Sequence, residues 1–169
     1  YAHSMALSAE GHVFTWGAGG DGRLGHGDWN NRLVPTRVES LVGVSGIAAG
    51  GQHSLAVVGG TGVVYSWGDG DYGQVGLGDT NSRNVPTAVP GLRGAQGDPE
   101  VVAVEAGWSH SLALDRGGTL RSWGDNFEGQ LGLGDTQERS SPTVVAGLQR
   151  VVDMAGGLKH TIALTLEGY

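Results

Sequence analysis

The stretch "WGDGDYGQVGLGD", Trp67 to Asp79, follows an apolar run and contains the spacing Gly68-x-Gly70-x-x-Gly73. After a β-strand, this spacing is typical of the loop that holds the pyrophosphate of a dinucleotide. In such a site a helix follows the loop, because the N-terminus of that helix binds the phosphate. No helical pattern follows Gly73, so the glycines need another explanation.

The stretch is one copy of an internal repeat. It recurs as "WGAGGDGRLGHGD" at Trp16 and as "WGDNFEGQLGLGD" at Trp123, where Asn126 replaces the middle glycine. A second phrase accompanies it: "HSMAL" at His3, "HSLAV" at His53, "HSLAL" at His110 and "HTIAL" at His160. The basic period is 50 residues, and the second copy gains one residue at Gly59-Gly60 and six around residues 93–99. Because the glycines recur once per repeat, they are predicted to be turn residues, and no nucleotide site is expected.

The composition favours short strands joined by tight turns. Glycine accounts for 33 of 169 residues, nearly three times its ordinary share of about 7%. Apolar runs such as "GVVYSW" and "HSLALD" indicate β-strands. Each copy predicts four strands, which in the third copy are residues 101–106, 109–115, 119–123 and about 142–145. Four short strands per repeat of this length form one blade of a β-propeller.

The predicted fold is therefore all-β, a β-propeller of four-stranded antiparallel blades. The whole chain, 1–169, is expected to be an arc of about three blades from a larger ring. The predicted repeats are residues 1–50, 51–107 and 108–157, followed by the start of a further hairpin at 158–169. The chain begins partway through a blade and ends where a hairpin turn is expected, so we expect a segment of a longer propeller. Self-assembly of such arcs into a ring is the alternative.

The repeated positions resemble the repeats of the regulator of chromosome condensation family. The residues that carry the resemblance are Trp67-Gly68, the run from Gly73 to Asp79, Arg83, Pro86-Thr87, Val89, and "AAGGQHSLAV" from Ala48 to Val57. No Trp-Asp dipeptide occurs, which separates the chain from WD-repeat propellers. The resemblance implies a ring of seven blades and about 350 residues. The chain departs from its own pattern at Glu105, His26 and Trp29, where other copies have Ala, Leu and Thr.

Several function classes are disfavoured by composition. Without cysteine, neither a disulfide nor a thiolate metal site can form. The formal net charge of −7 argues against direct contact with nucleic acid or an anionic membrane. A calcium site at Asp69 and Asp71 does not match the spacing of an EF-hand loop. We expect no cofactor, no metal and no enzymatic activity, and an intracellular protein of the cytoplasm or nucleus.

Residues that recur once per blade are predicted to build the blade. The repeated histidines are expected to bond neighbouring backbone groups, the Trp-Gly tryptophans to pack strand ends, and the repeated aspartates and arginines to hold the long loop. Function is expected where the copies differ. One such position precedes each repeated histidine by two residues. The candidate protein-binding residues are Tyr1, His26, Trp29, Asp69, Asp71, Trp108, Leu158 and Lys159. The alternative for this set is an ordinary solvated surface.

These observations predict a non-enzymatic protein–protein interaction scaffold within a larger protein or complex. Its expected partners are other proteins, such as a large assembly or a small GTPase. The resemblance also implies two alternatives. One is a guanine nucleotide exchange factor for a Ran-like GTPase, which in the family depends on a wedge-like insertion. Residues 93–99 are the nearest counterpart. The other is an ultraviolet-B photoreceptor, whose Gly-Trp-Arg-His phrase is here "GWSH" from Gly107 to His110, without the arginine.

Overall fold

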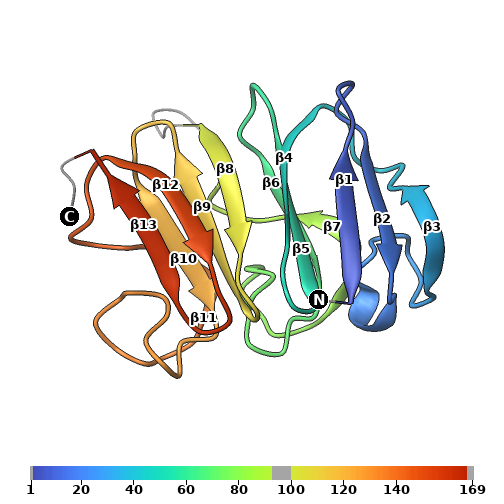
Figure 1. The fold of residues 1–169 in the computed structure, drawn as a ribbon. Helices are drawn as coiled ribbons and strands as arrows, with labels where there is room; N and C mark the ends of the chain where they lie inside the picture. Colours follow the sequence, from blue (N-terminus) through green and yellow to red (C-terminus); the bar gives the residue numbers. More distant parts are fainter. Residues whose placement is uncertain (1, 93–99, 167–169) are drawn as a thin grey trace.

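The computed structural model describes residues 2–92 and 100–166, which form four antiparallel sheets arranged as a fan (Figure 1). The first sheet contains β1 (His3–Leu7), β2 (Val13–Gly17) and β3 (Arg32–Arg37), with a short 3-10 helix, η1 (Gly20–Gly22). The second contains β4 (Val44–Ala49), β5 (His53–Val58), β6 (Val64–Gly68) and β7 (Arg83–Ala88). The third contains β8 (Val101–Ala106), β9 (His110–Asp115), β10 (Leu120–Gly124) and β11 (Arg139–Val144). The fourth is the hairpin of β12 (Val151–Gly156) and β13 (Thr161–Thr165).

This arrangement confirms the prediction of an all-β propeller arc. Within each sheet the strands follow one another in chain order. The predicted strands 63–67 and 119–123 occupy equivalent places as β6 and β10. Two of the described sheets have the expected four strands, while the first has three and the fourth two. The predicted repeat boundaries at 50/51, 107/108 and 157/158 fall in the turns between β4 and β5, β8 and β9, and β12 and β13. Among the described residues, no helix is long and apolar enough to cross a membrane.

The last strand of the third sheet begins earlier than predicted. The sequence placed it at about 142–145, with the proline at its start, whereas β11 spans Arg139–Val144. Arg139 pairs with Gly124 of β10 across a β-bulge. Because β11 is an edge strand, Pro142 is tolerated inside it despite its missing N–H. The strand therefore begins three residues before the proline.

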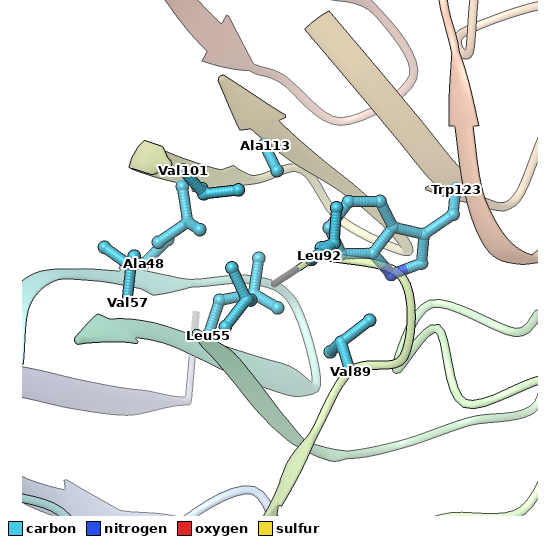
Figure 2. Packing of buried hydrophobic residues seen from close by; sticks show 10 residues of the cluster. Ala48, Leu55, Val57, Val89, Leu92, Val101, Ala113 and Trp123 are labelled. Atoms are coloured by element: carbon cyan, nitrogen blue, oxygen red, sulfur yellow. The ribbon is translucent and has the colours of Figure 1, made fainter. Parts of the chain in front are cut away.

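The hydrophobic core consists of layers between successive sheets. Figure 2 shows the layer between the second and third sheets, where Leu55 and Val57 share a cluster with Val101 and Trp123. Ala56, the residue between these two on β5, belongs to the cluster shared with the first sheet. Since β5 is buried on both faces, it is apolar without the polar alternation of a half-exposed strand.

The glycines of the repeated loop are turn residues, as predicted, and the structure adds a packing role for one of them. Gly68 and Gly73 have φ values of +104° and +75°, which residues with a Cβ rarely adopt. At Gly76 the restriction comes from the next blade: a Cβ there would lie 2.6 Å from Nε1 of Trp123. The loop of one blade can therefore cover the tryptophan of the next only because it lacks a side chain at this position.

Candidate protein-binding surface

Repeated polar residues join neighbouring blades. Nε2 of His53 lies 2.8 Å from the hydroxyl of Ser111 on the next sheet. That hydroxyl donates to the carbonyl of Gln74 at 2.8 Å, and Nε1 of Trp123 donates to the same oxygen at 2.8 Å. Because the serine proton is engaged, the hydroxyl must accept the Nε2–H of the imidazole. The expectation that the histidine bonds neighbouring backbone groups was wrong: its partner is a side chain of the next blade.

The same contact recurs along the arc. His3 reaches Ser54 at 2.9 Å, and His110 reaches Thr161 at 3.1 Å. Burial lowers the pKa of His53 to about 3 and the pKa values of His3 and His110 to about 4. These imidazoles are therefore neutral near pH 7, which fits a role as hydrogen-bond donors between blades. In the described part of the chain, no group of three or more His, Cys, Asp or Glu side chains is placed to hold a metal ion.

The repeated Asp–Arg pair fixes the long loop, as predicted. Asp79 accepts a hydrogen bond from the backbone N–H of Asn81 at 2.9 Å and pairs with Arg83 at 2.8 Å. These contacts hold the pKa of Asp79 below its usual value. The same ion pair recurs between Arg32 and Asp28 and between Arg139 and Asp135, at 2.6 Å in each case. These carboxylates are committed to their own loops.

The predicted binding residues that the structure describes lie at one end of the blades, which we call the loop end. In the second and third sheets, the turn between the first and second strands and the long loop between the third and fourth strands both emerge there. In the first sheet, the corresponding long loop joins β2 and β3. Trp108 lies in the turn between β8 and β9 and is 36% exposed. Its ring packs against the previous blade, where a Cβ on Gly51 would lie 2.9 Å from Cδ2 of the indole. Leu158 occupies the corresponding place before β13 and is exposed, and Tyr1 lies outside the described residues.

Trp29 and His26 occupy a different part of the loop end. Trp29 is 53% exposed and lies in the loop between β2 and β3 of the first sheet. This loop contacts β7, because the backbone N–H of Gly27 donates to the carbonyl of Asn84. The corresponding Thr80 and Thr136 are exposed in the complete sheets as well. His26 is half-buried, and its Nε2 lies 2.9 Å from the Thr15 hydroxyl of the same blade. Burial lowers the pKa of His26.

The two predicted loop carboxylates differ in accessibility. Asp69 is only 6% exposed, accepts the N–H of Asp71 at 3.1 Å and is approached by the amide of Gln52 at 3.4 Å. Burial raises the pKa of Asp69, and the nearby charges of Asp71 and Asp21 act in the same direction. Asp71 is exposed, so it is the carboxylate of this pair that a partner can reach. Binding by any of the predicted residues stays a prediction.

The structure adds residues that the sequence reasoning missed. The rings of Tyr72 and Phe127 meet edge to face across two blades, with centroids 6.1 Å apart. Tyr72 stands where the other copies have Asp21 and Glu128, and Phe127 where they have Gly20 and Asp71. Aromatic residues at positions that otherwise hold glycine or an acid were a visible signal in the aligned copies.

The predicted Lys159 also contacts the preceding blade. Its ammonium lies 2.9 Å from the carboxylate of Glu128, and this bond raises the pKa of Lys159. The loop end therefore carries aromatic, acidic and basic side chains contributed by successive blades.

Antiparallel sheets that repeat along the chain, with the same contacts between neighbouring sheets, are the blades of a β-propeller. The profile of the regulator of chromosome condensation (RCC1) repeat matches residues 10–57, 61–114 and 118–164. The chain therefore belongs to the regulator of chromosome condensation repeat family.

Relatives from several functional settings share this repeat. The chain is 37% identical over 171 residues to the ultraviolet-B receptor UVR8 of Arabidopsis thaliana. This match covers 99% of this chain and 38% of that protein. It is 39% identical over 173 residues to the E3 ubiquitin-protein ligase HERC2 of Homo sapiens, again over 99% of this chain but 4% of that protein. The crystal structure of Prp20p from Saccharomyces cerevisiae, described with its binding properties to Gsp1p and histones, matches with a TM-score of 0.80. That match has 25% identity and covers 98% of this chain and 43% of Prp20p. The chain thus spans less than half the length of each of these proteins.

Proposed function

We propose that this chain is the propeller part of a non-enzymatic protein-interaction scaffold and that it binds partners through the loop end of its blades. The observation that carries the proposal is the division between repeated and variable residues. Trp67, Trp123 and His53 recur and are fully buried between blades. Trp29 and Trp108, which do not recur, are exposed or partly exposed at the loop end.

The chemistry of the surface favours a protein as the partner. Tryptophan is enriched among the residues that dominate binding energy at protein interfaces. The net charge of −7 disfavours direct contact with nucleic acid or an anionic membrane. The likeness to Prp20p, described with its binding to Gsp1p and histones, supports a protein partner in a larger assembly.

The test is affinity capture from the native source with the full-length protein. Wild type is compared with Trp29→Ala, Trp108→Ala and Trp67→Ala, and melting temperatures are measured on the same samples. We expect at least one of the first two variants to lose partners while melting like wild type. Trp67→Ala should melt early because it opens a cavity between blades. If both exposed variants keep every partner, the scaffold binds elsewhere.

A second candidate is nucleotide exchange on a Ran-like small GTPase, which the likeness to Prp20p favours. The test is the release of labelled nucleotide from such a GTPase in the presence of the full-length protein. Clear stimulation of release would place exchange ahead of the scaffold proposal.

A further inference from the structure

A surface of aromatic and acidic residues lies where the second and third blades meet at the loop end. We call it the aromatic–acidic patch and define it by Asp71, Tyr72, Asp125, Phe127 and Glu128. Tyr72 and Asp71 follow β6, and the other three residues follow β10. Both sheets are complete and flanked by neighbours, so each blade beneath the patch is whole.

The aromatic pair in the patch is accessible, and its two rings contact each other. Phe127 is 62% exposed and Tyr72 is 38% exposed, although their edge-to-face contact removes part of each ring from water. The contact joins two blades, and the backbone N–H of Phe127 is held by the carboxylate of Asp125 at 3.0 Å. A ligand that stacks on these rings therefore meets a surface that the two blades already form.

The patch carries three carboxylates, and the one cation paired with it among the described residues is Lys159. Asp71 is exposed, and none of the described residues donates a hydrogen bond to its carboxylate. The negative charges nearest to it include the buried Asp69. Glu128 already binds one cation, Lys159 of the next blade. A cation can therefore sit beside these loops, and among the described residues none forms an ion pair with Asp71.

We infer that the aromatic–acidic patch binds an arginine-containing segment of a protein partner. A guanidinium can stack on an aromatic face and pair with a carboxylate in one geometry, whereas a lysine ammonium acts as a point charge. Phosphate groups of nucleic acid or lipid would be repelled by the three carboxylates. This inference rests on the proposed scaffold function and names the chemistry of the partner.

The test uses a synthetic peptide of arginine, glycine and serine, titrated into the full-length protein by calorimetry at several salt concentrations. The comparison peptide has citrulline, which is neutral, at each arginine. The test variants are Asp71→Asn and Phe127→Ser. Glu39→Gln is the matched control, because it changes the net charge as Asp71→Asn does but alters an exposed carboxylate beyond the end of β3. Melting temperatures check that each variant is folded.

We expect the arginine peptide to bind more tightly than the citrulline peptide and to weaken as salt rises. Each test variant should lose about threefold to fivefold in affinity, while Glu39→Gln should stay within about twofold of wild type. Equal affinity for the two peptides, or equal losses in Glu39→Gln and Asp71→Asn, would overturn the inference. If Trp29→Ala or Trp108→Ala loses partners in the capture experiment but the arginine peptide does not bind, the proposed scaffold function is supported and only this inference is overturned. A further outcome is that arginine binds at the patch while Trp29→Ala and Trp108→Ala keep every captured partner. This result would support the patch as a binding site and count against a binding role for those two tryptophans.

Discussion

Replacing Trp67 by alanine removes the side chain that joins the first two blades. The indole is fully buried and packs with Val38, Leu41 and Val44. Its Nε1 donates to the carbonyl of Arg23 at 2.9 Å. Truncating a buried tryptophan to alanine costs about 3–5 kcal/mol, as lost burial and a residual cavity. The carbonyl of Arg23 is not left unpaired, because it still accepts the hydroxyl of Ser54 at 2.9 Å.

The assay is urea unfolding of the full-length protein, with the free energy of unfolding compared between variants. Trp67→Phe retains most of the apolar volume and loses the indole N–H, so it should cost about 1–2 kcal/mol. Trp29→Ala is the matched control and should stay within about 0.5 kcal/mol of wild type, since its side chain is exposed. The reasoning is refuted if Trp67→Ala is as stable as wild type, or if Trp29→Ala loses as much stability as Trp67→Ala.

Two further predictions concern the contacts between blades. The unfolded chain binds protons on histidine near pH 6.5, whereas His53 and its counterparts bind them only near pH 3–4 when folded. Stability should therefore fall as pH drops from about 6.5 to 4, by on the order of 3 kcal/mol per histidine. Urea unfolding at several pH values checks this, and an unchanged slope in His53→Gln would count against it. Gly76→Ala should destabilise the protein by about 2–4 kcal/mol, because its φ is +74° and its Cβ would strike Trp123. Gly78 has a similar φ, but a Cβ there would meet nothing closer than 3.8 Å, so Gly78→Ala should cost only about 1–2 kcal/mol. Equal losses of stability in the two variants would show that the clash with Trp123 does not contribute.

The repeat made the blade predictable from sequence. Each blade is built from local hairpins, so the strand order follows directly from the strands and turns within one period. The buried state of Trp67 and Trp123 also followed, because a residue required once per blade serves the packing of blades.

Contacts between blades were harder to predict. His53 binds Ser111, 58 residues further along the chain, and nothing near His53 in the sequence points to that partner. The contact between Tyr72 and Phe127 was missed for a related reason, since each residue is unusual in only one copy. Their meeting depends on how two blades stack, which a pattern within one blade does not contain.

The central claim is that repeated residues hold the blades together while variable residues at the loop end bind partners. The most direct test is hydrogen–deuterium exchange on the full-length protein, free and saturated with the partner recovered by affinity capture. We predict that binding slows exchange in residues 69–82 and 125–138 and in the turn at 107–109. Protection confined to the opposite end, in the turns at residues 8–12, 59–63 and 116–118, would contradict the account.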